Sequence, residues 1–106
     1  MPYIVNTSLY PSEKAVEVGK IYLEAMKKYP LDESLGRAVV PTAAKTTLQG
    51  IKVMGIIKVK KGKLEDTMTW SANIMGMFRD VQGFESSTDV YMTIDEGYAS
   101  IGVSMT

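Results

Sequence analysis

The chain of 106 residues contains neither cysteine nor histidine. Without cysteine it has no disulfide, no thiolate nucleophile and no sulfur ligand for zinc or an iron–sulfur cluster. Without histidine it has no Ser-His-Asp triad, no imidazole that exchanges protons near neutral pH and no histidine ligand for haem. We therefore expect no cofactor and no metal site. The absence of cysteine also fits a cytoplasmic location.

The sequence also lacks an excess of charge of either sign and a long apolar run. Twelve basic and twelve acidic residues give a net charge of zero, which argues against general nucleic-acid binding. The longest apolar run, counting glycine, is Val53–Ile57, which is too short to cross a bilayer, and no signal-peptide pattern is visible. We therefore expect no nucleic-acid partner, no membrane partner and a single domain over residues 1–106.

The hydrophobic pattern predicts strands and helices in alternation. Tyr3–Tyr10 is rich in β-branched and aromatic residues and predicts a strand. Apolar residues then recur every three or four positions from Ala15 to Tyr29, which predicts a helix that ends before Pro30. A second helix is predicted over Leu64–Gln82. The other predicted strands are Arg37–Leu48, Ile51–Lys60, Ser87–Ile94 and Tyr98–Met105, the last two joined by a hairpin turn at Asp95-Glu96-Gly97.

This order, β-α-β-β-α-β with an extra C-terminal strand, predicts an α+β domain. Its simplest arrangement is an antiparallel sheet with two helices on one face, which leaves the other face bare. The strands are nevertheless partly apolar on both faces, as Met54 and Ile56 show on the second face of the third strand. An exposed apolar face of this kind indicates a partner. We therefore expect a homodimer whose sheets pack face to face, with the last strand completing the sheet or crossing to the other subunit.

The order and lengths of these elements resemble the dimeric α/β-barrel superfamily of ferredoxin-like domains over nearly the whole chain. The local features that match are Tyr10–Lys14 at the start of the first helix and Gly83–Glu85 after the second. The resemblance implies a ferredoxin-like fold in a dimeric barrel. The superfamily includes haem-using enzymes, cofactor-independent monooxygenases and ligand-sensing modules, so it implies no single function. The chain lacks the histidine of the haem-using members, whereas the cofactor-independent monooxygenases do not require it.

The segment Met1–Thr7 resembles the start of tautomerase-superfamily proteins. In that family the removal of the initiator methionine exposes a proline whose secondary amine is the catalytic base. The resemblance therefore implies that Pro2 is a catalytic residue, because an N-terminal amine can titrate near neutral pH without any histidine. The alternative is that a proline simply follows the initiator methionine.

Four residues are candidates for binding a ligand in a cleft between helices and sheet. Trp70 and Asn73 are three positions apart, so they are neighbours on one helix face, where the indole ring would stack on a planar molecule. Asn6 and Ser8 share a face of the first strand with apolar residues, and polar groups on a buried face mark a cavity with water or ligand. The alternatives are that Trp70 packs in the core or at a dimer seam and that the polar groups face water.

Three hypotheses about function remain open at this point. The first is a small homodimeric protein that binds an apolar or aromatic small molecule in the cleft. The second is an enzyme, either a cofactor-independent monooxygenase or a tautomerase that uses Pro2. The third is a structural dimer without a ligand.

Overall fold

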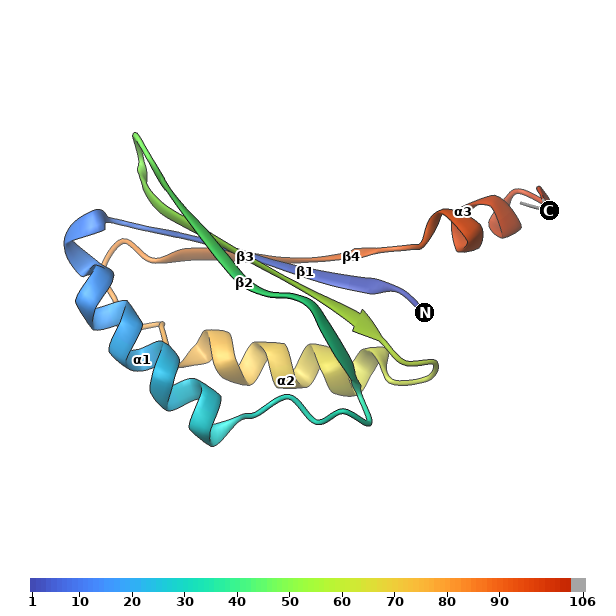
Figure 1. The fold of residues 1–106 in the computed structure, drawn as a ribbon, viewed down its shortest axis with the longest axis horizontal. Helices are drawn as coiled ribbons and strands as arrows, with labels where there is room; N and C mark the ends of the chain where they lie inside the picture. The colour runs from blue at the N-terminus through green and yellow to red at the C-terminus, as the bar shows by residue number, and fades with distance from the viewer. Residues whose placement is uncertain (104–106) are drawn as a thin grey trace.

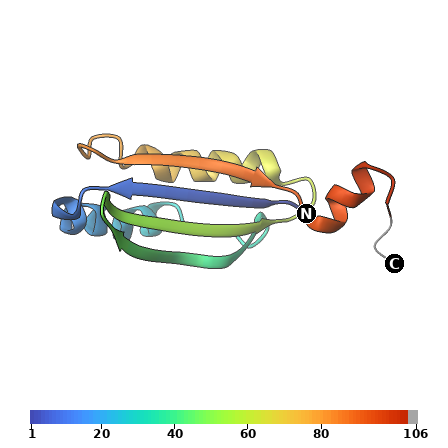
Figure 2. The ribbon, with the colours of Figure 1, turned by 90° about the horizontal axis from the view of Figure 1, so that it is seen from above.

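The computed structural model describes residues 1–103 and has an α+β architecture. Four antiparallel strands form one sheet in the order β2-β3-β1-β4, and Figure 2 shows them side by side. The strands are β1 (Tyr3–Tyr10), β2 (Gly36–Thr47), β3 (Gly50–Val59) and β4 (Glu85–Tyr91). Two helices, α1 (Ala15–Lys28) and α2 (Leu64–Gly76), lie together on one face of the sheet (Figure 1). The predicted α+β class and antiparallel sheet are confirmed.

The first half of the chain follows its predicted pattern closely. β1 has the bounds of the predicted strand Tyr3–Tyr10. A single turn of 3₁₀-helix, η1 (Ser12–Lys14), leads into α1, which ends at Lys28. The helix stops there because the residue before Pro30 is disfavoured in a helical conformation.

The core lies between the sheet and the two helices. Alternate residues of β1, among them Ile4 and Tyr10, are buried on the helix side of the sheet. The core has two clusters. One contains Tyr10, Val18, Ala25, Ile74, Phe78 and Val81, and the other contains Ile4, Ile57 and Val59. Trp70 packs against both clusters and so connects them.

β2 is an edge strand with an irregular register. Its pairing with β3 shifts between Ala38 and Val40, and again between Val40 and Ala43. Pro41 lies in this interval, and proline has no backbone N–H to donate to a neighbouring strand. The proline therefore lies where the ladder is interrupted on an edge strand, a position at which a sheet tolerates proline.

The predicted strand over Tyr98–Met105 is wrong for the residues that the structure describes, because a short helix, α3 (Ile94–Ser100), forms instead. Thr93 Oγ1 accepts a hydrogen bond from the Glu96 backbone N–H (3.2 Å), and Glu96 Oε1 accepts one from the Thr93 N–H (2.9 Å). This reciprocal capping box starts a helix at the position predicted for the hairpin turn. Residues 104–106, the end of the predicted strand, lie outside the described residues. α3 extends beyond the end of the sheet (Figure 1).

The second helix is shorter than the pattern predicts. α2 ends at Gly76 rather than at Gln82, and the chain continues in tight turns with hydrogen bonds such as Phe78 N–H to Met75 O (3.1 Å). Gly83 then adopts a positive φ of 81°, where a side chain would collide with Pro11. Within residues 1–103, no helix is both long and apolar enough to cross a membrane.

Candidate functional site

A cavity of about 290 Å³ separates part of the sheet from the helices. β1, β2 and β3 form its floor, and α1 and α2 form its opposite wall. Most of its lining is apolar, with Val53 and Ile57 in the floor and Met26, Ile74 and Met75 in the helices. The space is therefore suited to an apolar molecule rather than to an ion.

Small residues leave this space open. Gly55 on β3 lies directly opposite Asn6 on β1, so the middle of the floor has no side chain at that position. Gly19 on α1 also lines the cavity, and a Cβ added there would meet no atom within 4 Å. Both glycines lie inside regular elements, where glycine is less stable than alanine, and each keeps bulk out of the gap between the layers.

Hydrogen-bonded and aromatic side chains close the sides of the cavity. The Tyr22 hydroxyl on α1 and Thr42 Oγ1 on β2 are 2.8 Å apart, which joins the two elements across the gap. Elsewhere the Phe78 and Phe84 rings are stacked with their centroids 4.8 Å apart, and Tyr10 stacks on Phe84 at 6.0 Å. These contacts set the outline of the cavity without filling it.

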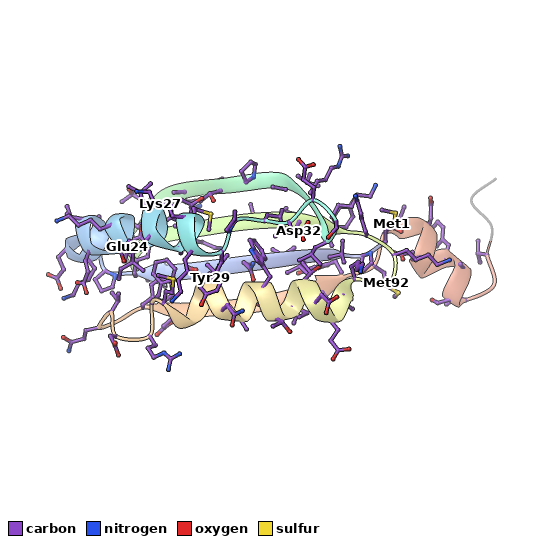
Figure 3. The ribbon with its side chains drawn as sticks, turned by 90° about the horizontal axis from the view of Figure 1, so that it is seen from below. Met1, Glu24, Lys27, Tyr29, Asp32 and Met92 are labelled. Atoms are coloured by element: carbon purple, nitrogen blue, oxygen red, sulfur yellow. The ribbon has the colours of Figure 1, made fainter. Side chains whose placement is uncertain are left out.

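Trp70 both packs and lines the cavity. Its indole N–H donates a hydrogen bond to the Tyr29 carbonyl (2.9 Å) at the end of α1, and Tyr29 lies beside α2 in Figure 3. This bond fixes the ring between the two core clusters, while the ring also borders the cavity. Trp70 therefore packs against the core and also borders the cavity, and its stacking on a ligand stays a prediction.

Asn6 and Ser8 lie on the cavity floor together with Tyr10. Asn6 Oδ1 accepts hydrogen bonds from Ser71 Oγ (2.9 Å) and from Thr88 Oγ1 (2.7 Å). The structure thus brings Asn6, Ser8 and Trp70 to one cavity, where their role as ligand-binding residues stays a prediction.

Asn73 does not join them. The inward face of α2 carries Thr67, Ser71 and Ile74, so Asn73 falls on the exposed face and does not line the cavity. Ser71 is not among the four candidates from the sequence, although it is only 1% exposed and lines the cavity. Its place next to the inward-facing Trp70, one helical turn after Thr67, is the signal that could have identified it.

Pro2 lies apart from the cavity and is not among its lining residues. Its carbonyl accepts a hydrogen bond from the Val59 N–H (2.8 Å), which fixes the start of β1 against the end of β3. The catalytic role of Pro2 stays a prediction.

The N-terminal amine connects the start of the chain to α3. The Met1 amine lies 2.5 Å from Glu96 Oε2, and Figure 3 shows Met1 at the end of the sheet next to this helix. The hydrogen bond from this amine, followed by the one from the Thr93 backbone N–H, lowers the pKa of Glu96 to about 2. The carboxylate is therefore charged at neutral pH and holds the first turn of α3 to the start of the chain.

The sequence matches no known family model and no curated protein. Among solved structures, the de novo designed protein Foldit4 is 14% identical, with a TM-score of 0.51 over 87% of this chain and 96% of that one. A formyltetrahydrofolate deformylase from Pseudomonas putida (11% identity, TM-score 0.45) matches over 84% of this chain and 28% of its own. An aminopeptidase PepT from Bacillus cereus (12% identity, TM-score 0.48) matches over 99% of this chain and 36% of its own. The chain thus spans about a third or less of these two enzymes, and the likeness to Foldit4 shows the fold alone.

Proposed function

We propose that the chain is a homodimeric ferredoxin-like protein of the dimeric α/β-barrel type that holds a small apolar or aromatic molecule. The observation that carries this proposal is the apolar cavity of about 290 Å³ between the helices and the sheet. Its volume lies near the lower end of the range for ligand sites, which favours a molecule of one or two fused rings. Apolar walls favour the transfer of such a molecule from water, and the Trp70 ring offers it a flat surface.

The strand order supports the ferredoxin-like assignment. The strands lie in the order β2-β3-β1-β4 and all neighbours are antiparallel. A helix follows β1 and another follows β3, and both return over the same face of the sheet (Figure 1). Two strand–helix–strand units arranged in this way are the pattern of that fold.

The open face of the sheet supports the homodimer. Tyr3, Val5, Thr7 and Leu9 alternate with the helix-facing residues of β1, so they lie on the opposite face. Val5 pairs with Ile56 on β3, and Thr7 pairs with Met54, which is 39% exposed. Together these side chains form an apolar stripe along the middle of the open face. A second sheet packed on this stripe would remove it from water.

The charges at the edges of the open face indicate which orientation the second copy takes. The β2–β3 half is basic, with Arg37, Lys45, Lys52 and Lys58, whereas β4 contributes Glu85 and Asp89. A twofold axis parallel to the strands places β2 of one copy over β4 of the other, so Lys45 meets Glu85 and the two basic halves stay apart. An axis across the strands would place the basic halves over each other. Electrostatic complementarity therefore favours the first arrangement.

Fluorescence of 6-propionyl-2-(dimethylamino)naphthalene, which has two fused rings and brightens in apolar surroundings, tests the binding proposal. We expect the wild-type protein to bind this probe and to transfer energy to it from Trp70, the single tryptophan, which borders the cavity. Gly19→Leu places a bulky side chain in the cavity wall and should weaken binding at least tenfold. Gly19→Ala, whose Cβ meets no atom, is the matched control and should bind like the wild type.

Two results would contradict the proposal. Absence of any fluorescence increase with the wild type would favour a structural dimer without a ligand. Equal binding by wild type and Gly19→Leu would place the probe elsewhere, for example on the open face of the sheet, and would also count against the cavity.

A further inference from the structure

The cavity contains two polar groups whose hydrogen-bonding capacity the protein does not use. Asn6 accepts two hydrogen bonds through Oδ1, but its amide nitrogen has no partner among residues 1–103. Ser8 is only 8% exposed, and no group in the same part of the chain hydrogen-bonds to its hydroxyl. All fully inaccessible side-chain nitrogens and oxygens of the described residues are paired, so these two unpaired groups border open space. Both residues line the cavity, and Ser8 also lines a second pocket beside Leu9 and Ser86.

The orientation of the Asn6 amide is fixed from two sides. Ser71 on α2 and Thr88 on β4 both donate to its Oδ1, at 2.9 Å and 2.7 Å. Ser71 is 1% exposed, so this contact is buried within the layer between helix and sheet. Because the oxygen is held by these hydroxyls, the NH₂ group of Asn6 is directed away from them.

We propose that the cavity selects flat, apolar molecules that carry a hydrogen-bond acceptor, such as an aromatic ketone. Asn6 Nδ2 and Ser8 Oγ donate to that acceptor, and Ser71 and Thr88 are positioning residues that hold the Asn6 amide. This inference rests on the proposed function, since it names the class of ligand for the same cavity.

The energetics of buried polar groups support this selectivity. An apolar molecule that fills the cavity displaces water from the Asn6 amide and the Ser8 hydroxyl and leaves them unpaired, which is unfavourable. A molecule with an acceptor at that point restores a hydrogen bond as it displaces the water. The difference in affinity between two matched molecules, one with the acceptor and one without it, should therefore depend on Asn6.

Two probes of similar shape test the inference, 2-acetylnaphthalene with a carbonyl and 2-ethylnaphthalene without one. Their dissociation constants are measured by titration followed in ¹H–¹⁵N spectra of the wild type, Asn6→Asp and Asn6→Leu at pH 8. Asn6→Asp keeps an oxygen for Ser71 and Thr88 but replaces the donor by an acceptor. We expect the ratio of the two constants to change by about three- to tenfold against the ketone in both variants. The Asn6 side-chain NH₂ signals of the wild type should shift with the ketone.

Thr88→Val tests the positioning role, because it keeps the shape of the side chain and removes the hydroxyl that donates to Asn6. It should lower the preference for the ketone while the affinity for 2-ethylnaphthalene stays unchanged. An unchanged ratio in the Asn6 variants, or binding of the ketone without a shift of the Asn6 amide, would overturn the inference and leave the proposed function intact. If neither probe binds the wild type, the proposed function fails as well.

Discussion

At the scale of single residues, small polar side chains keep the interior open. On α2 the inward positions hold Thr67 and Ser71, which are 0% and 1% exposed, instead of larger apolar residues. Burial of a hydroxyl is unfavourable unless it is hydrogen-bonded, and Thr67 donates to the Lys63 carbonyl (2.7 Å) while Ser71 donates to Asn6. Each hydroxyl is therefore satisfied without adding bulk. The cavity next to Ser71 results from this choice of residues.

The hydrogen bond of Trp70 is the residue-scale contact that we expect to contribute most to stability. Trp70→Phe removes the donor to the Tyr29 carbonyl, leaves that part-buried oxygen unpaired and reduces packing between the two core clusters. We expect a loss of about 1–3 kcal/mol in the free energy of unfolding, measured by urea denaturation. Tyr22→Phe removes an exposed hydrogen bond to Thr42 and serves as the control, with a smaller loss. Equal losses in the two variants would contradict this account.

At the scale of elements, the sequence predicts the strands and helices that have a sustained hydrophobic periodicity and a proline at the end. β1 and α1 are of this kind, with Pro11 and Pro30 at their ends. α3 was missed because the alternation of Ala99, Ile101 and Val103 is typical of a strand, whereas the capping box at Thr93 decides the local structure.

In the candidate site, local sequence pattern predicts the face on which a residue lies, but not the residues that it meets there. Strand periodicity places Asn6 and Ser8 on the helix-facing side of β1, but their neighbours come from distant parts of the chain. The spacing of Trp70 and Asn73 does not say which face of α2 is turned towards the sheet. That rotation depends on how the helix packs, and it leaves Asn73 on the exposed face. The empty volume itself follows from glycines and hydroxyls that meet only in the folded chain.

The attachment of α3 should depend on pH through Glu96. Hydrogen bonds from the N-terminal amine and, second, from the Thr93 backbone N–H lower the pKa of this carboxyl from 4.5 to about 2 in the folded state. A lowered folded pKa means that the contact stabilises the protein above pH 4.5 and that this contribution is lost as the pH falls towards 2. We expect the protection factors of the α3 amides, which correct for the intrinsic pH dependence of exchange, to fall over this range before those of β1 do.

Substitution of the carboxyl separates this contact from general acid unfolding. Glu96→Gln should give low protection factors in α3 at neutral pH and little further change in them down to pH 2, because the ion pair is already absent. Asp95→Asn, which alters the neighbouring carboxylate in the same turn, should behave like the wild type. The same pH profile in wild type and Glu96→Gln would contradict the role of the ion pair.

At the scale of the whole molecule, the two faces of the sheet differ in what covers them. The helix side contains the core and the cavity, whereas the open side presents an apolar stripe between a basic half and an acidic edge. In the row of Lys45, Lys52, Leu9 and Glu85, the positive and negative side chains lie at opposite ends. Such a face is complementary to itself after rotation about an axis parallel to the strands, and the proposed dimer would bury it.

A charge swap tests this arrangement, since Lys45 of one copy would face Glu85 of the other. Lys45→Glu and Glu85→Lys each place like charges opposite one another, and we expect each to raise the dissociation constant of the dimer about tenfold in sedimentation equilibrium. The double variant Lys45→Glu/Glu85→Lys restores opposite charges and should return the constant close to the wild-type value. Lys27→Glu, on the exposed face of α1, controls for net charge and should have no effect. A double variant weaker than either single one would exclude the parallel axis, and a wild type that sediments as a monomer at micromolar concentration would exclude the homodimer.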